Sequence, residues 1–206
     1  MPLQSYDSLN ALHMDVLQEI GNIGAGNSLA ALSTMISSKV DMTPPKVRIL
    51  SFAEAVESSG GAENVGVGIL LTLSGDINGM IMFIIEENFA HKMVNLLLSQ
   101  ALLSFEDNDE MSKSALCEIG NIMGASFINA IATMTGMAID ISTPSLAIDM
   151  MGAILSVPAI IFGEVGDKVL FIEEEFTDSV ETIKSRVALI PDVESLNKIL
   201  TRLGIE

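Results

Sequence analysis

The chain has few of the residues that most often form self-contained catalytic or metal sites. It contains one cysteine, two histidines, one tyrosine and no tryptophan among 206 residues. A single cysteine, Cys117, excludes an internal disulfide, and His13 and His91 are too far apart in sequence for a spacing typical of zinc ligands. No Ser-His-Asp or Cys-His arrangement and no phosphate-binding Gly-Lys-Ser/Thr loop is present. The sequence therefore predicts neither a complete nucleophilic site nor a metal cofactor of its own.

Basic residues and long apolar runs are also scarce. Ten Lys and Arg residues stand against 27 Asp and Glu, a formal charge of −17, which argues against nucleic acid as a partner because phosphate binding needs clustered basic side chains. An acidic surface suits a basic partner, although it also serves solubility alone. No uncharged apolar run approaches the roughly 20 residues that span a bilayer, and the N-terminus shows no basic and apolar signal segment. We therefore expect a cytoplasmic protein without membrane insertion.

What the sequence does contain is a repeat. The phrase Glu-Ile-Gly-Asn-Ile occurs at residues 19–23 and again at residues 118–122, an offset of 99 (118 − 19). The same offset links two later stretches that begin at Asp41 and Asp140 and lead into prolines. Because the repeat preserves a polar Glu/Asn pair together with the core pattern, we expect two copies of one functional surface.

Helical and strand patterns follow a similar order in both halves. The predicted helices are 9–36, 89–103, 111–134 and 191–203, with Ser8 as the first N-cap; the predicted strands are 47–50, 65–73, 80–85, 144–148, 169–176 and 186–190; residues 57–64 and 173–181 are expected loops. This order predicts an α+β fold with a pseudo-twofold internal repeat. We expect a largely antiparallel sheet against which the two long motif-bearing helices pack.

We expect the chain to form one domain over residues 1–206. Its two pseudo-repeats would cover about 8–103 and 107–206, with an acidic boundary at 104–110. Residues 150–166 have no evident counterpart in the first half and are expected to be an insertion.

Each repeated helix carries a narrow polar stripe. At about 100° per residue, four positions of the first helix fall at about 0°, 40°, 340° and 20° on the helical wheel. These residues form the first polar stripe, Asp15, Glu19, Asn22 and Gly26, and the second polar stripe consists of Ser114, Glu118, Asn121 and Ala125. A separate apolar face is expected from Val16, Ile20 and Ile23 in the first copy and from Ala115, Ile119 and Ile122 in the second.

The stripes are poorly suited to helix stability. Asp15 and Glu19 repel each other at i, i+4, and the glycines in and beside both stripes each cost up to roughly 1 kcal/mol relative to alanine. One interpretation is that the stripes present polar side chains to a partner. The alternative is that Glu and Asn hydrogen-bond within the fold while the glycines permit close helix packing.

A Glu/Asn pair is suited to a supporting role in phosphoryl chemistry. A carboxamide is a weak acid and base, but it donates and accepts hydrogen bonds at once, which allows it to orient a water molecule for in-line attack on phosphorus. A neighbouring carboxylate can bind a Lys or Arg of a partner. Such a stripe can complete the active site of a partner without being a complete site itself.

The pattern [Asp/Ser]-x-x-x-Glu-x-x-Asn, present twice in one chain, resembles the CheC family of bacterial and archaeal chemotaxis proteins, with its relatives CheX and FliY. The resemblance extends nearly from end to end, including the closing segment 191–204. It implies a phosphatase that dephosphorylates the response regulator CheY. In that family the motif helix lies across the phosphorylation site of the regulator.

The resemblance also implies roles for single residues. Asn22 and Asn121 would enter the acyl-phosphate site and position the attacking water, while Glu19 and Glu118 would contact the conserved lysine of the regulator. The expected partner-binding positions on the same stripes are Asp15, Ser114 and Gly26. The regulator would hold the Mg²⁺, and the receptor deamidase CheD is a further implied partner.

The rival hypothesis is a non-catalytic chemotaxis adaptor that binds CheD or the flagellar motor switch without hydrolysing phosphate. His13 is expected to be structural or exposed, because it lies away from the first polar stripe. Cys117 has no obvious activating base, so a partly buried thiol is expected. Met150 and Met151 are weaker candidates for partner contact.

Overall fold

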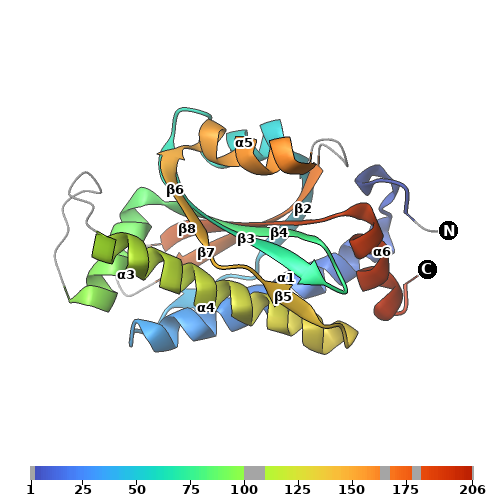
Figure 1. The fold of residues 1–206 in the computed structure, drawn as a ribbon, viewed down its shortest axis with the longest axis horizontal. Coiled ribbons are helices and arrows are strands. Elements are labelled where there is room, and N and C mark those ends of the chain that lie inside the picture. The colour runs from blue at the N-terminus through green and yellow to red at the C-terminus, as the bar shows by residue number, and fades with distance from the viewer. Residues whose placement is uncertain (1–2, 100–109, 163–167, 178–181, 206) are drawn as a thin grey trace.

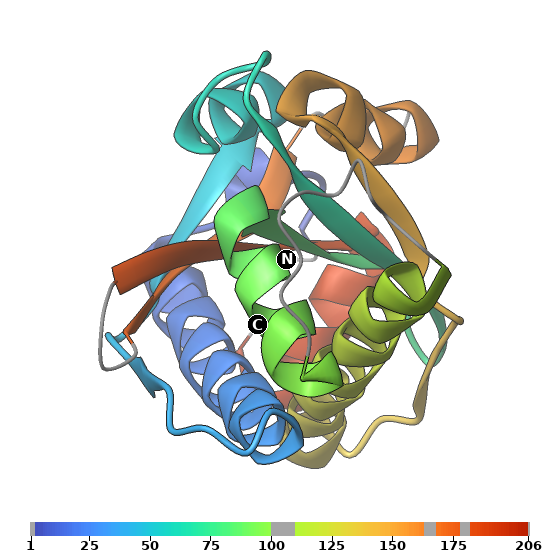
Figure 2. The ribbon, with the colours of Figure 1, turned by 90° about the vertical axis from the view of Figure 1, so that its left-hand side faces the viewer.

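In the computed structural model, which describes residues 3–99, 110–162, 168–177 and 182–205, the apolar strands form one sheet between two layers of helices (Figure 1). The helices are η1 (Tyr6–Ser8, a 3₁₀ turn), α1 (Ala11–Met35), α2 (Phe52–Ser58), α3 (Glu87–Leu98), α4 (Glu110–Thr135), α5 (Met151–Phe162) and α6 (Val193–Arg202). The strands are β1 (Asp41–Met42), β2 (Lys46–Ser51), β3 (Val65–Gly75), β4 (Gly79–Glu86), β5 (Ile139–Ile141), β6 (Ser145–Met150), β7 (Lys168–Thr177) and β8 (Thr182–Pro191). Figure 2 shows α1 beside α4 on one side of the sheet and α2 beside α5 on the other.

The sheet is antiparallel throughout the described strand pairs, which confirms the predicted α+β class. Its order is β1-β7-β8-β4-β3-β5, with β2 also on β7 and β6 also on β3. At the centre β4 pairs with β8, so the middle of the sheet joins one strand from each half. The outer strands are exchanged between the halves, since β2 lies on β7 of the second half and β6 lies on β3 of the first. Neither half completes its part of the sheet alone.

Two apolar cores lie on the two sides of the sheet. The larger one packs α1, α3, α4 and α6 against side chains such as Ile69, Phe83 and Ile172, all of which are fully buried. The smaller one packs α2 and α5 against the opposite side. Within the described residues, α4 is the one helix with the length and apolar composition of a membrane span, but 56% of the relevant window is buried inside the protein, as in a core helix.

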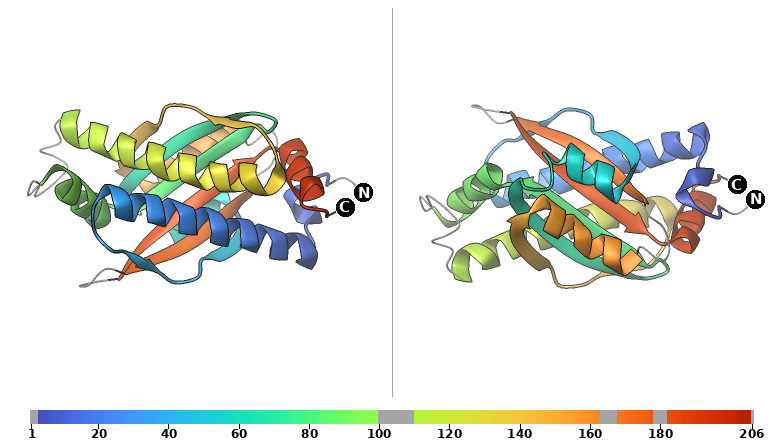
Figure 3. Two further views of the ribbon diagram at one scale, coloured as in Figure 1. Left: turned by 90° about the horizontal axis from the view of Figure 1, so that it is seen from below. Right: turned by 90° about the horizontal axis from the view of Figure 1, so that it is seen from above.

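The two long helices run antiparallel and touch near their middles. The ring of Phe127 on α4 fills the space beside Gly24 on α1, and the Ser28 hydroxyl donates a buried hydrogen bond of 2.9 Å to the Met123 carbonyl oxygen. The helices lie side by side across the sheet in Figure 3. This packing holds both repeated motifs on the same layer of the molecule.

The start of the first helix differs from the prediction. Ser8 ends the short η1 turn, and Asn10 is the N-cap of α1. The Asn10 side chain accepts from the backbone N–H of His13 at 3.0 Å, and the His13 ring accepts from the backbone N–H of Asn10 at 3.1 Å. This reciprocal pair satisfies two otherwise unpaired amides, so His13, which is buried, is structural as expected.

The interpretation of residues 150–166 as an insertion is wrong over its described part. Residue 151 begins α5 directly after β6, as residue 52 begins α2 directly after β2, and the offset is again 99 (151 − 52). Part of the loop expected at 57–64 is likewise the end of α2, whose start is fixed by a capping box between Ser51 and Glu54. Met151 is fully buried, so the expectation that it contacts a partner is also wrong.

Two further expectations concern acidic stretches. Residues 173–177 belong to β7 and are paired with β8, so the loop expected at 173–181 is wrong over that part. Glu173 on β7 forms an ion pair with Arg48 on the paired strand β2. The boundary expected at 104–110 lies outside the described residues except for Glu110, the first residue of α4.

Candidate functional site

Both polar stripes face away from the sheet. Asp15 and Glu19 are exposed while Asn22 and Gly26 are half-buried, and the second stripe repeats this pattern, with Ser114 and Glu118 exposed and Asn121 and Ala125 half-buried. The opposite side of α1 is buried through a row that includes Leu17, Ile20, Gly21 and Gly24. The prediction of the apolar face is thus only partly confirmed, because Ile20 is buried but Val16 and Ile23 are half-buried at the margin of the buried row.

Four of the motif glycines are explained by close packing. A Cβ added at Gly21 would lie 2.6 Å from Val47 Cγ2, and one added at Gly24 would lie 2.7 Å from the Phe127 ring. In the second copy, a Cβ at Gly120 or Gly124 would meet Ile69 or Leu71 at 2.3 Å or 3.1 Å. These distances are shorter than ordinary carbon–carbon contacts, so the glycines let both helices approach their neighbours closely.

Gly26 has no such explanation. A Cβ at this position would meet no atom within 4 Å, and its backbone lies on the first polar stripe beside Asn22. Its counterpart in the second copy is Ala125. Position 26 is therefore open space, and nothing within the fold requires a glycine there.

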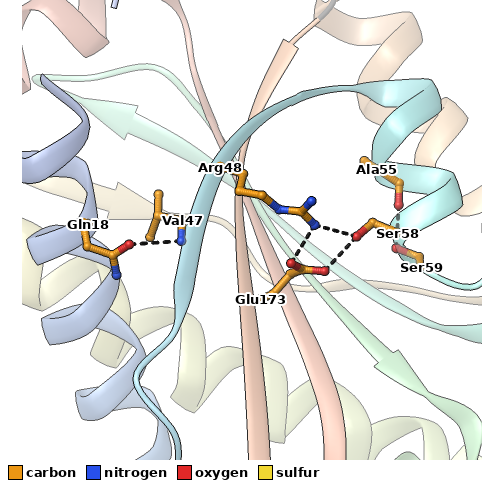
Figure 4. Close-up of polar contacts among 7 residues, drawn as sticks. All are labelled: Gln18, Val47, Arg48, Ala55, Ser58, Ser59 and Glu173. Carbon is orange, nitrogen blue, oxygen red and sulfur yellow. Dashed lines mark hydrogen bonds and ion pairs between the residues drawn. The ribbon is translucent and has the colours of Figure 1, made fainter. Parts of the chain in front are cut away.

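The side chains of the first stripe are connected by hydrogen bonds. Asn22 accepts a hydrogen bond of 3.0 Å from Gln18 Nε2, and its own Nδ2 donates to Glu19 Oε2 over a longer distance of 3.4 Å. Gln18 in turn accepts from the backbone N–H of Val47 on β2, as Figure 4 shows. The alternative interpretation, in which the stripe residues hydrogen-bond within the fold, is therefore partly confirmed. Asn22 does form such hydrogen bonds, but its stripe stays accessible to solvent.

Gln18 is a site residue that the sequence did not reveal. It lies one helical turn before Asn22, but its importance depends on a contact with β2, which is 29 residues further along the chain (47 − 18). The position 99 residues on is Cys117. Cys117 is half-buried, and burial raises the pKa of its thiol, so the expected inert thiol agrees with its surroundings.

The carboxylates of the two stripes are free to receive a cation. Within the described ranges neither Glu19 nor Glu118 forms an ion pair, and both are exposed on a chain with a formal charge of −17. In the same described ranges no three His, Cys, Asp or Glu side chains come together in a way that would hold a metal ion. The exposed carboxylates of the stripes are suited to contact with a positively charged partner group.

The structure keeps the two stripes apart. Because α1 and α4 run antiparallel, facing residues have numbers with a constant sum: Gly24 meets Phe127 and Ser28 meets Met123, and both pairs sum to 151. Asn22 on α1 therefore lies level with residue 129 on α4 (151 − 22). Asn121 is eight residues from that level (129 − 121), which is roughly 12 Å along the helix axis. The two Glu/Asn pairs therefore form two separate sites on the outer surface of one helical layer.

A polar cavity of about 250 Å³ lies elsewhere, at the edge of the sheet, and contains none of the stripe residues. Its lining includes Ser58, Glu173 and Arg186. Glu173 accepts from Arg48 at 2.6 Å and from the Ser58 hydroxyl at 2.7 Å, an arrangement visible in Figure 4. The stripes themselves are exposed helix surface, which is suited to docking against another protein.

The fold and these surfaces define a class of protein: a pseudo-twofold α+β chain that displays two equivalent Glu/Asn stripes on paired helices. Comparison with known proteins gives the family. The CheC-like family matches residues 12–49 and 111–148, the two segments that carry the stripes. The chain is 32% identical over 203 residues to the CheY-P phosphatase CheC of Bacillus subtilis, covering 97% of each chain. The chain belongs to the CheC-like family.

Solved structures agree on the fold. Thermotoga maritima FliY has a TM-score of 0.76 and 20% sequence identity, covering 96% of this chain and 98% of that one. CheX in the CheX–CheY–BeF3–Mg²⁺ complex from Borrelia burgdorferi has a TM-score of 0.54 and 18% identity, covering 81% of this chain and 94% of that one. Identities this low show a common architecture and nothing finer.

Proposed function

We propose that this chain is a phosphatase that removes the phosphoryl group from phosphorylated CheY, with the Glu and Asn of each stripe inserted into the acyl-phosphate site of the regulator. The observation that supports this most strongly is the double occurrence of an exposed Glu beside a half-buried Asn on the outer side of two packed helices. The name of the Bacillus subtilis relative, CheY-P phosphatase, supports the substrate. The existence of a CheX–CheY complex supports docking of this fold on the regulator. Such a role places the protein in the cytoplasm.

The proposed reaction is hydrolysis of an acyl phosphate. The oxygen of water forms a bond to phosphorus, the bond from phosphorus to the aspartyl oxygen breaks, and the products are inorganic phosphate, the regulator carboxylate and a proton released to solvent. The carboxamide of Asn22 or Asn121 holds the water in line with the breaking bond, because it offers a donor and an acceptor at once. Mg²⁺ bound to the regulator neutralises charge on the phosphoryl oxygens.

The remaining stripe residues bind the regulator. Glu19 and Glu118 each receive a lysine of CheY, an interaction favoured because both carboxylates are exposed and neither forms an ion pair within the described chain. Asp15 and Ser114 extend the same surfaces by one turn. Gly26 leaves room for the regulator, since its missing side chain would have met nothing in this protein.

The test is the rate of phosphate release from phosphorylated CheY in Mg²⁺, with and without this protein. The wild-type chain is expected to shorten the lifetime of the acyl phosphate, and Asn22→Ala and Asn121→Ala are each expected to remove part of the effect. Asn27→Ala is a matched control, because Asn27 is an exposed α1 residue outside the stripe. A lifetime that does not change when the wild-type chain is added would contradict the proposal.

A second candidate function is binding of CheD through α5. Near its C-terminal end this helix exposes large apolar side chains, Ile160 at 78% and Ile161 at 54%, with Val157 at 40% one turn before them. Exposed apolar clusters of this kind are typical of protein-binding surfaces. We expect Ile160→Asp to abolish co-purification with CheD and to leave phosphate release unchanged. Co-purification that survives this substitution would remove α5 as the binding surface.

A further inference from the structure

Gln18 connects the catalytic candidate Asn22 to the backbone of the segment that enters β2. Its Oε1 accepts from the Val47 N–H at 3.2 Å, and its Nε2 donates both to the Pro45 carbonyl oxygen at 2.8 Å and to Asn22 Oδ1 at 3.0 Å. Each of the five atoms in these three hydrogen bonds therefore has a complementary partner. Figure 4 shows Gln18 reaching from α1 to the strand.

These contacts determine which way the Asn22 amide faces. The Val47 N–H requires an acceptor, so it holds Gln18 Oε1 towards β2 and directs Gln18 Nε2 towards Pro45 and Asn22. A donor from Gln18 requires Asn22 to turn its oxygen inwards, which leaves Asn22 Nδ2 on the side of Glu19. The carboxamide is thus oriented before any partner binds. Donation to its oxygen also polarises the amide and strengthens its N–H groups as donors.

The second stripe lacks this support. At the offset of 99, Pro144 and Leu146 replace Pro45 and Val47, but the position of Gln18 is taken by Cys117. A thiol is a single weak donor and acceptor, and it cannot bridge two backbone groups and an amide at once. Among the described residues, no hydrogen bond joins the Asn121 side chain to another residue. The two sites therefore differ in how firmly their asparagine is held.

We propose that Gln18 is a positioning residue of the first site: it fixes the Asn22 carboxamide in the orientation used to hold the attacking water. The catalytic part of this proposal rests on the phosphatase function proposed above. Gln18 acts through Asn22, so its loss should lower the turnover of bound substrate and leave affinity for the regulator unchanged. A single neutral hydrogen bond of this kind corresponds to an effect of about threefold to tenfold on a rate.

The first experiment isolates the first site in an Asn121→Ala background. Adding Gln18→Met keeps the length of the side chain and removes its hydrogen-bonding groups. We expect kcat for phosphorylated CheY to fall about threefold to tenfold with KM unchanged. Cys117→Met in the same background is the matched control at the equivalent position of the inactivated copy, and it should leave both constants unchanged. If Gln18→Met leaves kcat unchanged, or raises KM alone, Gln18 does not position Asn22 for the reaction.

The second experiment does not depend on catalysis. In ¹⁵N NMR spectra of the free protein, the Asn22 side-chain amide should be more rigid than that of Asn121. Gln18→Met should shift the Asn22 amide resonances and lower their order parameter. An Asn22 amide as mobile as that of Asn121 in the wild-type chain would overturn the proposal. If the amide is rigid but the wild-type chain never accelerates phosphate release, the proposed phosphatase function is wrong, while the proposal that Gln18 orients the Asn22 amide still holds.

Discussion

Gly24 and Gly26 lie two residues apart in α1, and replacing each with alanine should affect the free energy of unfolding very differently. Both are interior helical positions, so either substitution gains up to about 1 kcal/mol of helix propensity. Only their surroundings differ. A Cβ at Gly24 would lie 2.7 Å from the ring of Phe127, which is fully buried, whereas a Cβ at Gly26 would meet nothing within 4 Å.

The magnitude follows from that difference. Because the propensity gain is common to both variants, the gap between them measures the cost of overpacking, about 1–3 kcal/mol. Gly26→Ala should therefore stabilise the protein and raise Tm by about 2–4 °C, as expected for a gain near 1 kcal/mol in a chain of this size. Gly24→Ala should unfold about 1–3 kcal/mol more easily than Gly26→Ala.

Urea unfolding and thermal melts of the two variants and the wild-type chain provide the measurement. The m-value should stay constant, so that the midpoint alone reports stability. If Gly24→Ala proves as stable as Gly26→Ala, the close packing of α1 on α4 is not the reason for Gly24. If Gly26→Ala is destabilising, position 26 does not have the open space that the structure shows there.

Three further predictions concern buried polar groups and the stripe. Burial raises the pKa of Glu174 from 4.5 to about 8, so between these pH values the folded chain retains a proton that the unfolded chain loses. The stabilising contribution of the protonated carboxyl group is complete below about pH 4.5 and is lost as the pH rises through about 8. The free energy of unfolding, measured in urea, should therefore depend less on pH for Glu174→Gln than for the wild-type chain. Ser28→Ala should lower the free energy of unfolding by about 1 kcal/mol, because it removes the buried bond to the Met123 carbonyl oxygen. Gly26→Leu in an Asn121→Ala background should raise KM for phosphorylated CheY about threefold or more while the melting temperature does not fall, whereas an unchanged KM would remove position 26 from the docking surface.

The long elements could be predicted from the sequence because their patterns are strong and repeated. The offset of 99 residues and the helical spacing of the stripes located α1 and α4 and their solvent-facing positions. The hairpin of β3 and β4 was indicated by the glycine-rich turn, where Gly75 and Gly79 adopt positive φ.

The short elements were harder to predict. The helix α2 has seven residues, too few for a periodic signal, although Ser51 and Glu54 form the capping box that marks its start. The helix α5 contains Pro158 and is apolar on all sides, so it resembled an irregular insertion. The exchange of β2 and β6 between the halves is a long-range pairing that local patterns do not specify.

The geometry of the candidate site was predictable to the extent that it depends on one helix. Glu19 and Asn22 share a stripe because of helical spacing, and that stripe is indeed accessible. The contribution of Gln18 depends on where β2 passes α1, which is a tertiary contact. The same limit explains why the unequal support of the two asparagines emerged only from the structure.

The most direct test of the central claim is the lifetime of phosphorylated CheY with saturating Asn22→Ala/Asn121→Ala double variant in Mg²⁺, with binding of the regulator measured in parallel. The account predicts that the variant binds phosphorylated CheY through its Glu19 and Glu118 surfaces and leaves the lifetime equal to that of CheY alone. A double variant that shortens the lifetime as much as the wild-type chain would show that the asparagines do not perform the reaction.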